Sequence, residues 1–245
     1  MNDEYKKFFD LSYKLLDQFK TTAPGTFIHC QNVSLLCEGI GKEVGLDSEK
    51  LKLAGLYHDI GKMWFPQYFS ENIVDKNPHD LLDPITSYHI LTRHVSDSVN
   101  ILLNEPDFPR DVIEIISKHH GDMILQAIYI KYKEMNPAAL NCDHLFRYKT
   151  HKPDCLYSTI LMIVDSVEAA AKSKYNDNKL NSHDDRLNLI EMMIEKMGTN
   201  LDNLTRGMER TIKNKLIREL DSIYHPRVSY ETLPKNEEVE KNNES

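Results

Sequence analysis

The chain has 245 residues, of which 40% are hydrophobic and 28% charged, so it fits an ordinary globular protein of one large domain or two small ones. The formal net charge of −8 argues against a general nucleic-acid binder, because such proteins need a basic face to displace counterions. It leaves room for a local basic pocket that binds a small phosphate ligand. The N-terminus has no apolar signal-peptide core, and no window approaches 18 uninterrupted apolar residues, so we expect no membrane span.

The cysteines Cys30, Cys37, Cys142 and Cys155 form no CxxC pair and no zinc-ribbon spacing. Four cysteines in a chain of this length do not make a disulfide framework, which favours a reducing compartment. We therefore expect a cytoplasmic protein.

Apolar residues recur at spacings of three and four along almost the whole chain. The periodicity predicts helices over residues 3–20, 27–44, 48–59, 83–104, 109–119, 122–135, 155–174, 183–197 and 207–224. Thr26 is the predicted N-cap of the second helix, and Asp47 or Ser48 that of the third. No run alternates like a strand, and there is no internal repeat, so the sequence predicts an all-α fold.

Two irregular stretches interrupt the helical pattern. The first, after the third helix, contains Pro66, Pro78 and Pro84 and is longer than compact domains usually allow, which is typical of functional loops. The second precedes the helix that begins near residue 155. Gly61, at the start of the first stretch, is expected to ease the backbone geometry at a helix end.

Ionisable residues lie on or near apolar helix faces at seven positions. They are His29, His58, Asp59, His94, His119, His120 and Asp165. A single ionisable residue of this kind is usually hydrogen-bonded in the core. Seven of them would need seven separate partners to offset the free-energy cost of burying polar groups. A single cluster of divalent metal ions compensates all of them, because neutral imidazole and carboxylate are natural ligands. The sequence thus predicts a compact helical bundle with a metal centre in its core.

The ligand types indicate which metals and which chemistry to expect. Five histidines and two carboxylates, with one carboxylate bridging, supply two ions and leave open positions for water and substrate, as a two-metal hydrolase requires. Nitrogen and oxygen ligands without cysteine favour iron or manganese, with cobalt, nickel or zinc as alternatives, over calcium and magnesium. His89 lies five residues before His94, about 140° away around a helix, and is expected to point elsewhere.

The order of these residues resembles the HD superfamily of metal-dependent phosphohydrolases. It reads His29, then "HDIGK" at 58–62, His94, "HHGD" at 119–122 and Asp165. The Gly-Tyr-Pro signature of the HD-GYP branch is absent. The stretches "SYHILTRHVSDSV", "IISKHHGD" and "ILMIVDSVEAAAKS" are more similar to the cytoplasmic HD domain of seven-transmembrane HD proteins, the cyclic di-AMP phosphodiesterase group.

This resemblance extends over roughly residues 25–230 and implies a division of the chain. Residues 1–24 would form an N-terminal helix packed on the domain, 25–230 the HD phosphohydrolase domain, and 231–245 a disordered charged tail. The chain is expected to be a free-standing relative of the membrane proteins or a fragment of one.

The resemblance also assigns roles. One ion would be held by His29, His58, Asp59 and Asp165, and the second by His94, His119 and His120, with Asp59 bridging the two. A water between two cations loses its proton near neutral pH, and the resulting metal-bridging hydroxide would attack phosphorus. Asp59 and Lys62 are accordingly the predicted catalytic residues.

Four residues are candidates for binding substrate: Lys62, Arg93, Arg147 and Tyr68. Lys62 lies about one turn beyond His58 and could contact a phosphate, whereas a lysine at a helix end is otherwise solvated. Arg147 could clamp a phosphate with two hydrogen bonds, and an ordinary surface arginine is an equal reading. Arg93 has the same two readings, and Tyr68 could stack on a base or anchor its loop.

The leading hypothesis is hydrolysis of a cyclic dinucleotide, first of all cyclic di-AMP, to the linear dinucleotide. The alternatives are a hydrolase of another nucleotide or phosphate ester, a di-iron oxygenase on the same helical scaffold, and a non-enzymatic metal-stabilised binding module. The expected partner is a small nucleotide rather than a nucleic-acid polymer, and a homo-oligomer is left open.

Overall fold

A computed structural model describes residues 3–224, and this part of the chain is built from helices. The α-helices are α1 (Asp3–Lys6), α2 (Lys14–Thr22), α3 (Pro24–Val44), α4 (Ser48–Tyr57), α5 (Pro84–Leu103), α6 (Arg110–Ser117), α7 (Gln126–Met135), α8 (Leu156–Asn176), α9 (His183–Met197) and α10 (Arg206–Tyr224). Short 3-10 helices are η1 (Lys7–Phe9), η2 (Ile60–Trp64), η3 (Pro66–Tyr68), η4 (Ser70–Asn72), η5 (Pro78–Asp80), η6 (Asp143–Phe146) and η7 (Gly198–Leu201). Between residues 3 and 224 there is no strand, only a single bridge between Ile124 and Arg147. The all-α prediction is confirmed.

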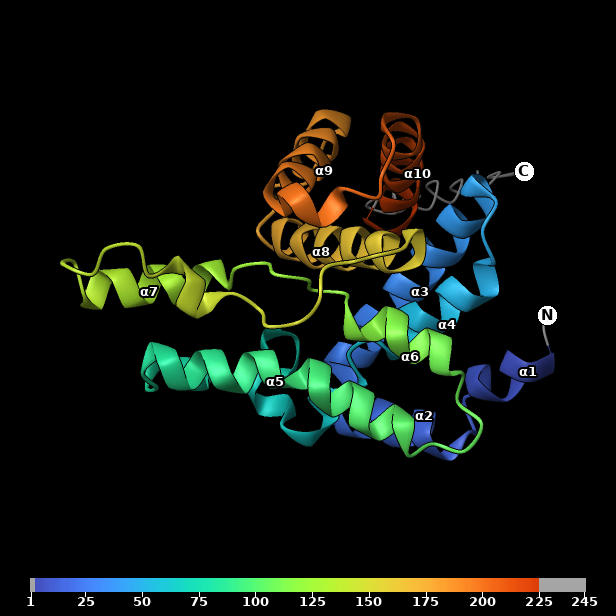
Figure 1. Cartoon of the computed structure of the whole chain (residues 1–245), viewed down its shortest axis with the longest axis horizontal. Coiled ribbons are helices and arrows are strands. Elements are labelled where there is room, and N and C mark those ends of the chain that lie inside the picture. The colour runs from blue at the N-terminus through green and yellow to red at the C-terminus, as the bar shows by residue number, and fades with distance from the viewer. Residues whose placement is uncertain (1–2, 225–245) are drawn as a thin grey trace, which may run out of the picture.

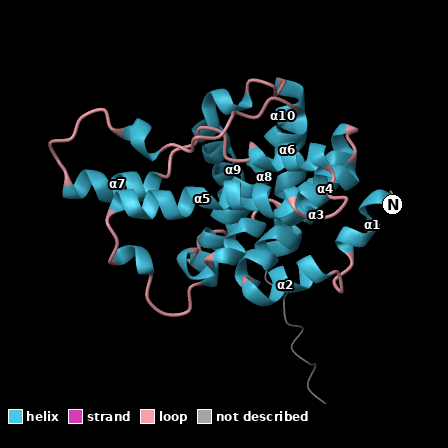
Figure 2. Cartoon of the chain, turned by 60° about the horizontal axis from the view of Figure 1, so that its bottom comes forward, coloured by secondary structure: helices cyan, strands magenta, loops and turns pink. Residues whose placement is uncertain are grey.

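Helices α3, α4 and α8 form the centre of the bundle (Figure 1). Helices α9 and α10 cover one side of α8, and α5 and α6 lie on the other side. Helix α7 runs beside the N-terminal half of α5, and the two project away from the body of the molecule (Figure 2). Across residues 3–224 no helix is both long and apolar enough to cross a membrane.

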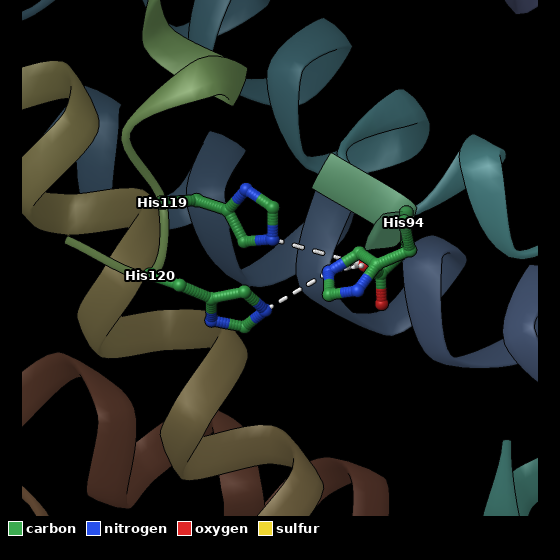
Figure 3. A group of neighbouring side chains, drawn as sticks. His94, His119 and His120 are labelled. Carbon is green, nitrogen blue, oxygen red and sulfur yellow. Dashed lines mark hydrogen bonds and ion pairs between the residues drawn. The ribbon is translucent and has the colours of Figure 1, made fainter. Parts of the chain in front are cut away.

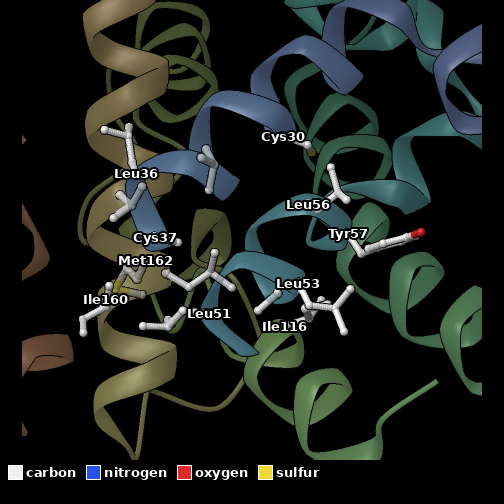
Figure 4. Packing of buried hydrophobic residues seen from close by; sticks show 14 of the residues in the cluster. Cys30, Leu36, Cys37, Leu51, Leu53, Leu56, Tyr57, Ile116, Ile160 and Met162 are labelled. Atoms are coloured by element: carbon white, nitrogen blue, oxygen red, sulfur yellow. The ribbon is translucent and has the colours of Figure 1, made fainter. Parts of the chain in front are cut away.

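The core is centred on α4 (Figure 4). Leu51 and Leu53 of this helix are fully buried, beside Ile116 of α6 and Ile160 of α8. Each such side chain contributes roughly 1.5–3 kcal/mol by leaving water. A Cβ added to Gly55 would lie 2.9 Å from the Cα of Ser34, so the small residue lets α3 and α4 pack closely. This packing fixes the end of α4, where the His-Asp pair lies.

The single helix predicted over residues 3–20 is wrong. The chain breaks between η1 and α2, because the Asp10 carboxylate accepts hydrogen bonds from the backbone and the hydroxyl of Ser12, both at 2.8 Å. Such a turn competes with the helix for backbone groups. Leu11 is 53% exposed, whereas Phe8 and Phe19 are buried in the core.

The predicted N-cap Thr26 is also wrong, because α3 already begins at Pro24. Proline suits the first turn of a helix, where its missing N–H needs no partner. The capping acceptor comes from η4: Asn72 Oδ1 accepts from the backbone N–H groups of Gly25 at 2.9 Å and Thr26 at 3.1 Å. The prediction for α4 is confirmed, since Asp47 caps it by accepting from Glu49 and Lys50.

The other predicted helices agree with the structure to within a few residues, except that α7 begins at Gln126 rather than near 122. Gly121 has a φ of +50°, which ends regular helix before that point. Met123 then accepts a backbone hydrogen bond from Tyr148 at 2.9 Å.

Gly61 allows a close approach of η2 to α5 rather than a special backbone conformation, since its φ is not positive. A Cβ at this position would lie 2.2 Å from the carbonyl oxygen of His94 and 2.4 Å from the backbone nitrogen of Ser98. The backbone N–H of Gly61 also donates to Ser98 Oγ at 2.8 Å. This contact holds the end of α4 against the helix that carries His94.

We expect Gly61→Ala to lower the free energy of unfolding by about 1–3 kcal/mol, because the atoms in its way belong to backbone that cannot yield cheaply. Urea unfolding followed by circular dichroism measures the change. Gly207→Ala is the matched control, because within residues 3–224 its Cβ would meet only Thr205 Oγ1, at 3.9 Å. Equal stability of the two variants would contradict the close-packing role of Gly61.

Candidate metal centre

The seven residues singled out in the sequence come together in the centre of the bundle. His29 lies on α3, His58 and Asp59 at the end of α4, His94 on α5, His119 and His120 after α6, and Asp165 on α8. They form two groups, and the potential ligand atoms within each group lie within 4.8 Å of one another. Asp59 belongs to both groups.

The two carboxylate oxygens of Asp59 face different groups. Oδ2 lies 3.3 Å from His58 Nε2 and 3.9 Å from His29 Nε2. Oδ1 lies 3.2 Å from His94 Nε2 and 3.7 Å from His119 Nε2. One buried side chain therefore offers an oxygen to each side of the centre.

Asp165 and His120 complete the two groups. Asp165 Oδ1 lies 3.0 Å from His29 Nε2 and 3.4 Å from His58 Nε2, and Oδ2 lies 3.6 Å from His120 Nδ1. His120 Nε2 approaches His94 Nε2 to 3.1 Å. Figure 3 shows His119 and His120 pointing toward His94 from the segment that follows α6.

The backbone sets the tautomer of three histidines. The Nδ1 atoms of His58, His94 and His119 lie 2.9, 2.6 and 2.6 Å from the carbonyl oxygen of the residue three positions earlier. A carbonyl only accepts, so each Nδ1 carries a proton, and in its neutral form each ring directs the Nε2 lone pair into the centre. Burial lowers the pKa of His94 to about 4, so this imidazole is neutral at pH 7.

Buried acceptors without donors indicate that a cation fits between these residues. His58 Nε2, His119 Nε2 and Asp59 Oδ1 are buried and have no hydrogen-bond partner within residues 3–224. Buried polar atoms are rarely left in this state, and lone pairs that face one another repel. Divalent ions bound by these nitrogens and oxygens would satisfy them all, so the donor set fits a metal centre.

Lys62 lies at the edge of the centre, held by two carboxylates. Its Nζ is 2.7 Å from Asp59 Oδ2 and 2.9 Å from Glu71 Oε1, and it lies 5.0 Å from the ring centre of Phe69. Burial alone would raise the pKa of Asp59, but the positive charge of Lys62 holds it well below its usual range. Asp59 is thus an anion in the absence of any bound metal.

The two predicted arginines are engaged elsewhere in the protein. Arg147 donates to Asp143 Oδ2 at 3.0 Å and to the Asp122 carbonyl at 3.1 Å, and its side chain is 40% exposed. Arg93 pairs with Asp97 at 3.1 Å and lies over the ring of Phe65 at 5.6 Å. Each guanidinium keeps N–H groups that these bonds do not use, and the phosphate contacts of Arg93 and Arg147 stay predictions.

The loop after α4 contains both buried and exposed aromatic residues. Tyr68 lies 5.6 Å from the His79 ring and accepts a hydrogen bond from His79 Nε2 on its carbonyl at 2.9 Å, which anchors the loop. Phe69 is buried against His94, with ring centres 5.8 Å apart. Trp64 and Phe65 are 44% and 42% exposed.

Comparison with known proteins identifies the family. The family model described as "HD domain" matches residues 26–170, more than half of the chain. The chain belongs to the HD-domain family.

Two relatives in the family are named cyclic-di-AMP phosphodiesterases. This chain is 35% identical to the cyclic-di-AMP phosphodiesterase PgpH of Listeria monocytogenes over 222 residues, and 33% identical to PgpH of Bacillus subtilis over 220 residues. These alignments cover 89% of this chain and 30% of each relative, so the chain spans under a third of their length. The crystal structure of the L. monocytogenes PgpH HD domain in complex with cyclic-di-AMP has a TM-score of 0.80 at 32% identity, covering 88% of this chain and all of that one.

The HD-domain resemblance in the sequence did not reveal three residues that surround the cluster. Glu168 accepts a hydrogen bond from His29 Nδ1, and it lies three residues after Asp165, a spacing that places both on one helix face. This spacing could have identified Glu168 from the sequence. Glu71, which holds Lys62, and Tyr148, whose ring lies 4.2 Å from that of His120, come from irregular segments without periodicity.

We expect His94→Ala to lose about half of the bound metal, because it removes one of three nitrogens from the group whose only carboxylate, Asp59, is shared with the other group. His89→Ala should retain both ions. His89 is exposed and faces Tyr88, with ring centres 5.2 Å apart, as the helical-wheel prediction required. Manganese content of the purified variants, measured by inductively coupled plasma mass spectrometry, makes the comparison. Equal losses in both variants would show that the helix face is wrongly assigned.

Proposed function

We propose that this chain is a metal-dependent phosphodiesterase that hydrolyses a cyclic dinucleotide, first of all cyclic di-AMP, to the linear dinucleotide. The observation that carries the proposal is the buried carboxylate of Asp59, shared between two groups of ligand atoms. The names of the PgpH relatives and the cyclic-di-AMP complex of the L. monocytogenes HD domain support the substrate class.

The proposed ligands of one ion are His29, His58, Asp59 and Asp165, and those of the other are Asp59, His94, His119 and His120. We propose iron or manganese for both, with cobalt, nickel or zinc as alternatives, because the donors are nitrogen and oxygen alone. Two divalent ions bound here would supply Lewis acidity toward phosphate oxygens and a water that deprotonates near neutral pH.

The chain's own residues prepare the site for an anionic ester. Asp59 keeps both oxygens directed to the two groups because η2 is packed against α5. Lys62 uses two of its three N–H donors on Asp59 and Glu71, which leaves one donor and a fixed positive charge for a phosphate oxygen. Hydrolysis adds one water across the P–O bond, so that the water oxygen joins phosphorus and the leaving sugar oxygen gains a proton.

We propose a cytoplasmic location and the following domain limits. Cys30, Cys37, Cys142 and Cys155 are all unpaired, which supports a reducing compartment and hence a cytoplasmic location. We also retain residues 25–230 as the catalytic domain and 1–24 as a segment packed on it. The predicted disordered tail, 231–245, lies outside the described residues.

A turnover panel tests the function. Cyclic di-AMP, cyclic di-GMP, linear dinucleotides, and nucleoside mono- and triphosphates are incubated with the enzyme and manganese or ferrous iron, and products are separated by liquid chromatography. We expect linear dinucleotide from cyclic di-AMP, and no product with Asp59→Ala. Release of phosphate from nucleotides alone, or oxygen consumption without a linear dinucleotide, would reject the proposal in favour of another hydrolase or an oxygenase.

Lys62→Met should lower kcat on cyclic di-AMP by roughly 10²–10³, the effect of removing one preorganised donor to a developing charge. Metal content should change far less than kcat, since Lys62 is no ligand in this scheme. Lys42→Ala is the control, because Lys42 is exposed on α3 and pairs with Glu38 rather than with the clustered residues. An unchanged kcat in Lys62→Met would remove Lys62 from the reaction.

A further inference from the structure

The last described helix, α10, reaches the metal centre through a buried hydrogen-bond network. Tyr224, its final residue, donates from its hydroxyl to Glu168 Oε1 at 2.6 Å. Asn32 Nδ2 donates to the same oxygen at 2.7 Å, and Oε2 accepts from His29 Nδ1. Glu168 is only 1% exposed, so both its oxygens are satisfied by these three side chains rather than by water.

This arrangement gives His29 an orienting partner that the other proposed ligands lack. His58, His94 and His119 are oriented by backbone carbonyls of their own segments, whereas the Nδ1 of His29 has the Glu168 carboxylate as its partner. A carboxylate accepts the Nδ1 proton, so the neutral ring presents Nε2, 3.0 Å from Asp165 Oδ1, as the nitrogen available to a metal ion. A carboxylate in this position also raises the basicity of the imidazole as a metal ligand.

Helix α10, which completes the network, lies beyond the region matched by the family model, because that region ends at residue 170. Helix α10 packs against α3, which carries His29 and Asn32, and against α8, which carries Glu168. Tyr224 itself is buried, and its ring faces that of Tyr175 with centres 5.2 Å apart. The end of α10 is thus fixed against both helices that supply the His29 side of the centre.

We propose that Glu168 is the positioning residue of His29 and that α10, through Tyr224, sets the metal affinity of the His29 side of the centre. This inference rests on the proposed metal centre. It implies that the two ions differ in what holds them: the ion on the His94 side depends on α5 and the segment after α6, and the ion on the His29 side also depends on the C-terminal helix. A displacement of α10 would then loosen one ion and leave the other.

Titration of Mn²⁺ into metal-stripped full-length protein, followed by calorimetry, tests the proposal without any substrate. We expect Glu168→Gln to weaken one of two Mn²⁺ sites by about 10–100-fold, the usual effect of losing such a partner. Tyr224→Phe keeps the ring and removes one hydroxyl, so it should weaken the same site by less. Tyr175→Phe is the matched control, because Tyr175 contacts Tyr224 but makes no hydrogen bond to Glu168, and it should leave both sites unchanged.

A double-mutant cycle separates positioning from general destabilisation. If Tyr224 acts through His29, Tyr224→Phe should weaken Mn²⁺ binding in the wild-type background and have no further effect when combined with His29→Ala. Equal effects in both backgrounds, or unchanged affinity in both Glu168→Gln and Tyr224→Phe, would overturn the inference. If Glu168→Gln does not fold, the Tyr224→Phe cycle decides alone. Failure of the wild-type protein to bind Mn²⁺ would instead overturn the metal centre, and with it the proposed function.

Discussion

Asp59 is buried with one carboxylate oxygen facing His29 and His58 and the other facing His94 and His119. A buried anion surrounded by acceptor lone pairs costs several kcal/mol unless cations compensate it. Lys62 supplies one positive charge at Oδ2, but Oδ1 has no hydrogen-bond donor within residues 3–224. The chain therefore maintains an energetically unfavourable arrangement that bound divalent ions would turn into a favourable one.

Contacts in the rest of the bundle hold the clustered side chains in position. Close helix contacts at Gly55 and Gly61 join α3, α4 and α5, so that ligands distant in sequence meet without long flexible segments. Backbone carbonyls set the tautomers of three histidines, and Glu168 does so for His29. On the other side, η4 caps α3 through Asn72 and holds Lys62 through Glu71, which links the long loop to the centre. Each device restricts a side chain that would otherwise sample several rotamers.

The sequence allowed the ligands to be predicted because helical periodicity marks which positions should be apolar. His29, His58, Asp59 and Asp165 stand out as violations of that pattern, and their order matched a known family. Residues in irregular segments carry no such marking. Glu71 and Tyr148 reach the centre only through the path of their loops. The acidic partners of Arg93 and Arg147 lie four residues away in each case, a spacing that the sequence did offer. The N-terminal break was missed for a similar reason, since the Asp10–Ser12 turn lies within an apparently amphipathic run.

The central claim is that Asp59 bridges two ions, and anomalous diffraction tests it most directly. Crystals grown with manganese would be measured on both sides of the manganese absorption edge. The account predicts two anomalous peaks, one beside Asp59 Oδ1 near His94 and His119, and one beside Oδ2 near His29 and His58. A single peak bound to one oxygen, or peaks away from Asp59, would contradict it.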